Sequence, residues 1–74
     1  MDDWLAAACE TLARETGLSP AEFEIDPATA ATLLDLAGIA AHESGTRSNA
    51  PLFCYLVGVA ARRASVEQIA AAFR

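Results

Sequence analysis

The sequence contains no lysine, and its five basic residues, all arginines, are outnumbered by ten acidic ones. The formal net charge of −5 and the isoelectric point near 4.5 argue against a nucleic-acid binder, which needs a basic surface to meet phosphates. Cysteine is also scarce, because Cys9 and Cys54 could close at most one bridge. The composition is therefore not that of a disulfide-rich secreted domain, and we expect both thiols to be reduced.

Long hydrophobic runs are missing as well. The longest, residues 50–61, spans 12 residues, whereas a membrane-spanning helix needs about 20. Asp2 and Asp3 place negative charge where a signal peptide carries positive charge. We expect a cytoplasmic protein with no membrane span and no targeting segment.

The length of 74 residues predicts a single small domain over residues 1–74. An unfolded chain of 7.7 kDa exposes roughly 11,000 Å² and a folded one roughly 4,300 Å², so only about 60% of the surface can be buried. In a domain with so thin a core, the free energy gained by burying apolar surface nearly equals the conformational entropy cost of folding. We therefore expect additional stability to come from a partner.

Helix signals dominate the first half of the chain. Asp3 is a candidate N-cap for a helix over residues 4–16, and Gly17 is its expected stop. The spacing of Trp4, Leu5, Ala8 and Leu12 gives that helix one apolar face. A capping box at residues 19–22 predicts a short helical turn through residue 23. The Asp-Pro pair at residues 26 and 27 then opens a helix over residues 28–43, which ends before Gly45.

The second half predicts two further helices. Ser48 or Asn49 can cap a helix over residues 51–63, and a second capping box at residues 65–68 opens a last helix reaching Phe73. Residues 52–59 have no polar face, and a helix that is apolar all round must be enclosed.

Together these signals predict an all-α fold: a compact bundle of four main helices plus a short connecting helical turn, with a central antiparallel pair. Gly38 and Gly58 each lie in mid-helix, where glycine costs about 1 kcal/mol relative to alanine. Close backbone approach would explain that cost, within one chain or across a dimer. We take Gly38, Leu52, Tyr55 and Gly58 as candidate packing and interaction residues.

The charges are unevenly distributed along the chain. Residues 1–43 carry nine acidic residues and one arginine, a net of −8, whereas residues 44–74 carry four arginines and one glutamate, a net of +3. Opposite charges attract, so the two halves are expected to pack against each other or against a neighbouring copy. A basic docking patch for an anionic partner is the alternative.

A small cluster of polar side chains follows the helix over residues 28–43. Arg47, His42 and Asn49 lie near the N-terminus of the next helix, where free N–H groups and the helix dipole favour an anion. The alternative is structural: Arg47 pairs with Glu43 or caps the carbonyl groups at the end of the helix over residues 28–43, and His42 fixes the loop by hydrogen bonding. No spacing of ligand residues predicts a metal site, and no catalytic constellation is present, so we expect neither a cofactor nor an enzyme.

Most of the sequence resembles a known family, and several short segments carry the resemblance. The segments concerned are residues 33–37 (LLDLA), 40–42 (AAH), Arg47, 49–52 (NAPL) and 56–60 (LVGVA), with Trp4 and Leu5 near the start. The resemblance covers residues 4–61 and is to a small actinobacterial domain of unknown function, often encoded beside or fused to the molybdenum cofactor guanylyltransferase. Relatives place proline directly after the arginine, whereas Ser48 follows Arg47 here. The resemblance implies an accessory role near molybdenum cofactor maturation, but no reaction.

Two functions are compatible with the sequence. The first is a non-catalytic interaction domain that forms a homo-oligomer, such as a dimer, or docks onto a protein of the cofactor pathway. The second is a small phosphate- or nucleotide-binding module that uses Arg47, His42 and the N-terminus of the helix over residues 51–63, the fourth helix when the short turn is counted.

Overall fold

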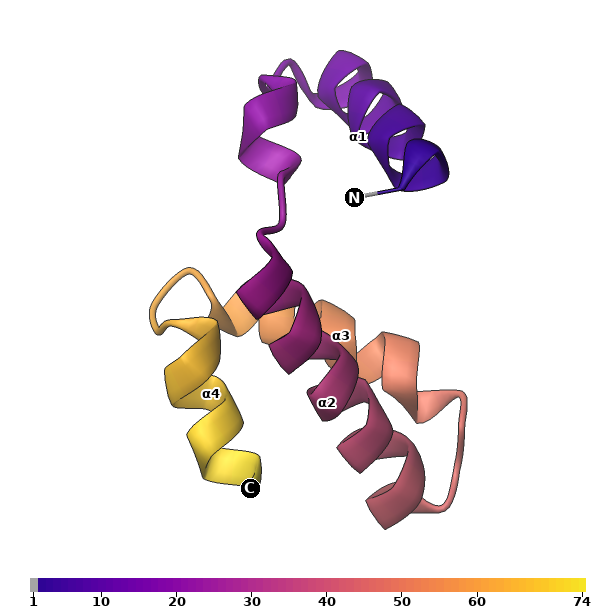
Figure 1. Ribbon diagram of the computed structural model, residues 1–74, viewed down its shortest axis with the longest axis vertical. Coiled ribbons are helices and arrows are strands. Elements are labelled where there is room, and N and C mark those ends of the chain that lie inside the picture. The colour runs from indigo at the N-terminus through magenta and orange to yellow at the C-terminus, as the bar shows by residue number, and fades with distance from the viewer. Residues whose placement is uncertain (1) are drawn as a thin grey trace.

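The computed structural model of the protein describes residues 2–74 and is all-α over that range (Figure 1). The elements, in chain order, are α1 (Asp3–Thr16), the short 3₁₀ helix η1 (Pro20–Phe23), α2 (Pro27–Ser44), α3 (Asn49–Ala60) and α4 (Val66–Phe73). The predicted fold of four main helices and a short connecting turn is confirmed.

Most helix ends are set by the local motifs that predicted them. Gly17 and Gly45 end α1 and α2 in the left-handed conformation, with φ of 75° and 71°, which glycine adopts without a steric penalty. The Ser19 backbone N–H donates to the Glu22 carboxylate at 2.9 Å, as expected for a capping box. A second capping box opens α4.

Several helix boundaries differ from the prediction by one to three residues. Helix α1 begins one residue early, because Asp2 and not Asp3 is its N-cap and accepts from the Leu5 N–H at 2.8 Å. Helix α3 ends at Ala60 and not near Arg63. There the Arg63 N–H bonds to the carbonyl oxygen three residues back, at 3.0 Å, and this tight turn redirects the chain toward α4. Ser48 is the N-cap residue of α3, although its side chain makes no capping bond.

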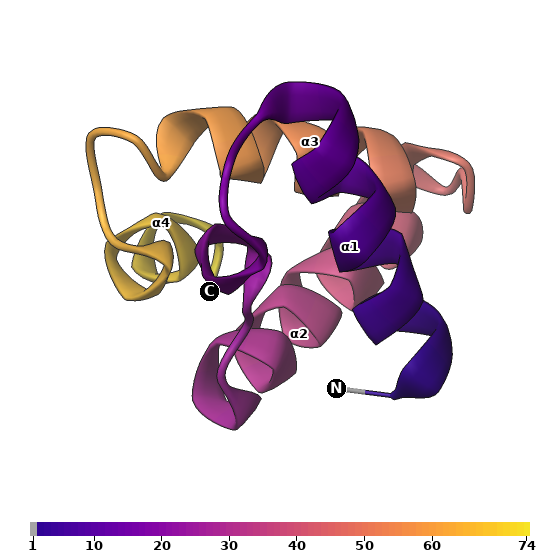
Figure 2. The same cartoon turned by 90° about the horizontal axis from the view of Figure 1, so that it is seen from above.

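The core lies where α2, α3 and α4 meet. Its buried side chains are Leu36 of α2, Val57 of α3 and Ala70 of α4, and Leu36 is 0% exposed. Helix α3 runs back across α2, as the predicted antiparallel pair requires (Figures 1 and 2). Four partly buried side chains pack around this centre: Leu33, Phe53, Val66 and Ile69. One leucine and two smaller residues make a thin core, as the chain length predicts.

Polar contacts join α2 to the C-terminal segment. The Thr32 hydroxyl donates to the Glu67 carboxylate at 2.8 Å, and Arg74 forms an ion pair with Asp35 at 2.8 Å. Both members of that ion pair are substantially exposed, so it contributes little to stability. Packing of the three helices is therefore the main stabilising interaction of this body.

Helix α1 lies apart from this three-helix body. It contacts η1 but none of α2, α3 and α4 (Figure 1). Ala13 is its one buried residue, and the Cys9 thiol donates a weak hydrogen bond to the Phe23 carbonyl oxygen at 3.6 Å. The radius of gyration is 13.2 Å, against about 11 Å for a globular chain of this length. The chain is thus extended for its size.

The predicted close crossing at Gly38 and Gly58 is wrong within one chain. A Cβ atom built on either glycine meets no atom within 4 Å. The reason is that α2 and α3 meet through larger side chains, including Leu36 and Val57, which hold the backbones apart at the glycines.

Open space at Gly38 predicts that Gly38→Ala stabilises the chain. Alanine is favoured over glycine in a helix interior by about 1 kcal/mol, which corresponds to roughly 4–8 °C in a domain of this size. Thermal unfolding followed by circular dichroism measures the shift. A lower melting temperature would show that something approaches Gly38 closely, and a partner chain would then be the candidate.

The N-cap of α2, Asp26, predicts that the stability of the fold decreases at acidic pH. The backbone and side-chain hydrogen bonds from Thr29 hold the pKa of Asp26 below its usual range. A lowered folded-state pKa stabilises the fold at pH values above about 4, and the contribution is lost as the pH falls through the folded-state pKa. Asp26→Asn keeps a capping oxygen without titrating. Urea unfolding at several acidic pH values should therefore show a shallower acid loss in the variant, and parallel profiles would contradict this.

Candidate functional site

The most unusual surface of the protein is the outer face of α3. Four apolar residues lie there at positions i, i+3, i+4 and i+7, and each is between 44% and 73% exposed. We call this set the apolar stripe: Leu52, Tyr55, Leu56 and Val59. The opposite face of α3 carries Phe53, Cys54 and Val57, which turn toward the core.

The predicted enclosure of α3 is therefore incomplete within a single copy, where its outer face stays exposed. Among the elements described, α2 and α4 are the ones that pack against it, and both lie on its inner side. Helix α1, which could have supplied further cover, contacts η1 instead. The apolar stripe consequently has no covering element among residues 2–74.

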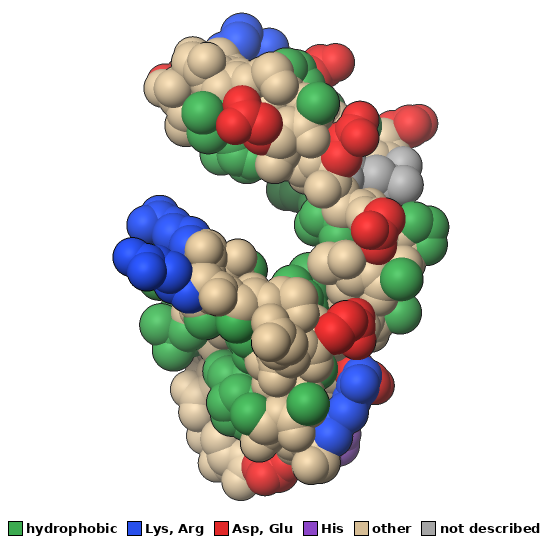
Figure 3. Space-filling view, turned by 90° about the vertical axis from the view of Figure 1, so that its left-hand side faces the viewer, with side chains coloured by type: hydrophobic (Ala, Val, Ile, Leu, Met, Phe, Trp, Pro, Cys, Tyr) green, Lys and Arg blue, Asp and Glu red, His purple; other side chains and the backbone are tan. Residues whose placement is uncertain are grey.

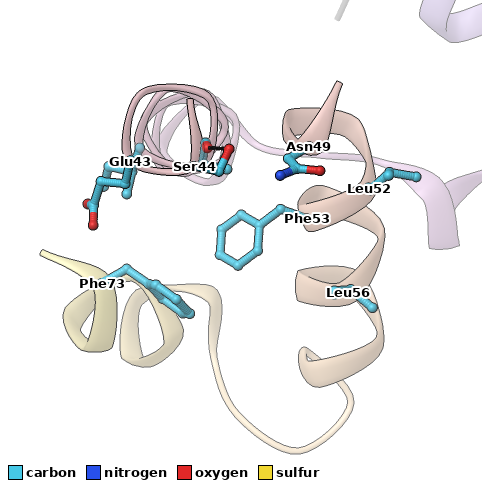
Figure 4. A pocket seen from close by; sticks show the side chains of 9 residues that line it. Glu43, Ser44, Asn49, Leu52, Phe53, Leu56 and Phe73 are labelled. Atoms are coloured by element: carbon cyan, nitrogen blue, oxygen red, sulfur yellow. Dashed lines mark hydrogen bonds between the residues drawn. The ribbon is translucent and has the colours of Figure 1, made fainter. Parts of the chain in front are cut away.

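A groove runs beside the stripe where the end of α2, α3 and the end of α4 come together. Its volume is about 330 Å³, and Figure 4 shows the rings of Phe53 and Phe73 facing one another inside it. The two ring centroids are 4.9 Å apart, in an edge-to-face arrangement. The residues that line the groove are Ile39, Ala40, Glu43, Ser44, Asn49, Leu52, Phe53, Leu56 and Phe73.

The chemistry of this groove suits apolar side chains. Its polar groups lie at one end, and one of them, the Ser44 hydroxyl, is already used in a hydrogen bond to the Ala40 carbonyl oxygen at 2.6 Å. The charged group among them is the carboxylate of Glu43. Leu52 and Leu56 belong both to the groove and to the stripe, so the two form one continuous apolar surface.

Most of the predicted anion-binding residues lie outside the groove. His42, Arg47 and Asn49 are all exposed around the turn between α2 and α3, and of the three only Asn49 lines the groove. The alternative pairing of Arg47 with Glu43 is not formed: the ion pair found within residues 2–74 joins Arg74 to Asp35. The anion site stays a prediction. Titration calorimetry with a guanine nucleotide, comparing the wild type with Arg47→Ala, tests it.

Two of the four predicted interaction residues lie in the apolar stripe. Leu52 and Tyr55 both belong to the apolar stripe, and Gly58 is exposed beside it, whereas Gly38 lies on α2. Sequence reasoning missed Leu56 and Val59 as members of the same surface. The spacing of four residues over two turns was a signal that could have identified them.

A second apolar surface is carried by α1. Trp4 is 74% exposed, and Leu5 and Leu12 on the same side of the helix are also exposed. With Ala8 they form the predicted apolar face of this helix, which we call the α1 face. Between α1 and η1 lies another concavity, edged by Glu10, Glu24 and Asp26.

Among residues 2–74, one ion pair joins the acidic and the basic half of the chain, that of Arg74 with Asp35. Arg47, Arg62 and Arg63 make no ion pair among residues 2–74, and the α1 segment, residues 2–16, carries four acidic residues and one arginine. Figure 3 shows acidic side chains spread over the upper, α1-bearing part of the molecule with basic atoms at its top, basic side chains together with acidic ones on the lower part, and a hollow between the two parts. The predicted electrostatic attraction is therefore largely unused in a single copy.

Other types of site have little support. Among residues 2–74, no group of three or more histidine, cysteine or acidic side chains is arranged to hold a metal ion. None of the helices described is long and apolar enough to cross a membrane.

Comparison with curated proteins and with solved structures finds no match. A family model does match, and it covers residues 1–74. It carries no named activity, so the surfaces described above are the main guide to function. The chain belongs to the family described as a domain of unknown function, DUF6457.

Proposed function

We propose that this protein is a non-catalytic interaction domain that associates with a second copy of itself. The observation that carries the proposal is the apolar stripe of α3, four apolar side chains in helical register that nothing among the described residues covers. Contiguous exposed apolar surface of this kind is typical of interaction sites.

The total exposed surface supports the same proposal. The single chain exposes 5573 Å². A folded monomer of this mass exposes roughly 4,300 Å², so the excess is roughly 1,300 Å² per chain. Permanent homodimers bury about 2,000–5,000 Å² in total, or about 1,000–2,500 Å² per subunit. The excess is therefore the amount that one dimer interface would remove.

Thermal unfolding at several protein concentrations tests this function. Association stabilises the folded chain by mass action, so the melting temperature of the wild-type protein should rise with concentration. A melting temperature that stays constant over about a hundredfold range of concentration would contradict self-association.

We further propose that the assembled domain is an accessory of molybdenum cofactor maturation. The support is the resemblance carried by residues 33–37, 40–42 and 49–52, which is to a domain encoded beside or fused to the guanylyltransferase. Co-purification with the guanylyltransferase of the same organism tests this role. Enzyme retained by the immobilised wild-type domain but not by Leu56→Asp would support it, and equal retention on both, or on neither, would contradict it.

A further inference from the structure

We infer that the surface formed by the groove and the apolar stripe is the binding site for α1 of a second copy, so that two chains exchange their α1 helices reciprocally. This inference rests on the proposed self-association and specifies the two surfaces that meet. Each copy would place its α1 face on the α3 surface of the other, which gives a two-fold symmetric dimer with two identical contacts.

The α1 face has the properties of the occupant. An amphipathic helix that binds a groove anchors itself through apolar residues on one side. The α1 face offers Trp4, Leu5 and Leu12 for this, and all three are exposed in the single chain. With 14 residues, α1 is about 21 Å long, close to the roughly 18 Å of the 12-residue α3.

Residues 2–74 do not fill the groove of their own chain. Helix α1 is held against η1 through Ala13 and Cys9. These two residues lie on the side of the helix adjacent to the α1 face. Helix α1 contacts none of α2, α3 and α4. Two apolar surfaces are therefore exposed on one molecule, and neither covers the other. A second copy supplies the missing partner for each of them.

Charge selects α1 over a second α3 as the occupant. Arg47 precedes α3, and Arg62 and Arg63 follow it, so arginines flank both ends of the stripe. The adjoining groove is lined by one carboxylate, that of Glu43. Packing one stripe on another about a two-fold axis would bring arginines together in either orientation, and like charges across an interface oppose association. The α1 segment is acidic, and its carboxylates at residues 2, 3, 10 and 15 form no ion pair among residues 2–74.

The single tryptophan of the chain reports directly on this contact. Trp4 lies on the α1 face and is exposed in one copy, so its fluorescence should move to shorter wavelength as the protein associates. In Leu56→Asp, whose change is on α3, the emission should stay at long wavelength. Ala7→Asp, on the exposed polar side of α1, is the matched control and should behave as the wild type.

Mixing two variants gives the decisive test. Leu12→Asp damages the α1 face and Leu56→Asp damages the α3 surface, so each should associate at least about 100-fold more weakly than the wild type. In a mixture, the intact α1 of the second variant can bind the intact groove of the first, which restores one of the two contacts. Sedimentation of the mixture should therefore show more dimer than either variant alone.

The outcomes separate this inference from the function on which it rests. Complementation in the mixture together with a Trp4 shift supports the exchange of α1. If Leu12→Asp and the wild type form dimers equally well and Trp4 does not shift, α1 is not the occupant, although self-association stands. If the wild type remains a monomer, both proposals fail.

Discussion

Leu36→Ala is expected to remove most of the stability of the three-helix body. Leu36 is 0% exposed and is the largest side chain that is fully buried, so its truncation leaves a cavity between α2, α3 and α4. Leucine-to-alanine changes at such positions cost about 2–5 kcal/mol. That is a large share of the stability available to a domain with so small a core.

Urea unfolding followed by circular dichroism measures this loss, and Leu34→Ala is the matched control. Leu34 lies on the same helix two residues away but is 74% exposed, so its truncation should change the stability by less than about 1 kcal/mol. Equal losses in the two variants would mean that the core is not where α2, α3 and α4 meet, or that Leu34 is itself covered by a partner.

Leu56→Asp is expected to abolish self-association while leaving the helices intact. The side chain is 61% exposed in the single chain, so an aspartate there stays hydrated and the monomer folds. At an interface the same carboxylate would be buried without a partner, at a cost of about 3 kcal/mol or more, which corresponds to at least about a 100-fold weaker association.

Sedimentation velocity and far-ultraviolet circular dichroism together check this prediction. Ala31→Asp, an equal change of charge at an exposed position of α2, should leave association unchanged. If Leu56→Asp associates as strongly as the wild type, the apolar stripe is not an interface. If it loses helical signal even at high dilution, Leu56 supports the fold of the single chain.

The helix ends could be predicted because their signals are local. Gly17 and Gly45 each need only the freedom of glycine at one left-handed position, and the capping boxes that begin at Ser19 and Ser65 need only residues three apart. No knowledge of the rest of the chain is required for either signal. The same holds for the cap of α2 at Asp26.

The arrangement of the helices could not be predicted in the same way. Phe53 and Val57 on one side of α3 are no more apolar than Leu52 and Leu56 on the other, so no polar residue marks which side faces solvent. That choice depends on where α2 and α4 lie, which is a tertiary property. The misplaced glycine crossing has the same origin, since where two helices touch depends on the side chains between them.

The candidate site was predicted only in part. Leu52 and Tyr55 were identified as interaction residues because the helix that carries them is wholly apolar. The α1 face was recognised as apolar, but its separation from the three-helix body was not foreseen, because η1 and not α2 or α3 receives it. Whether a surface is left uncovered is known only once every other element has been placed.

Sedimentation equilibrium of the wild-type chain tests the central claim most directly. The exposed apolar stripe and the excess surface predict a particle of twice the 7.7 kDa chain mass, which dissociates on dilution and is lost in Leu56→Asp. A particle of one chain mass at every concentration, stably folded with the stripe in contact with water, would contradict the account.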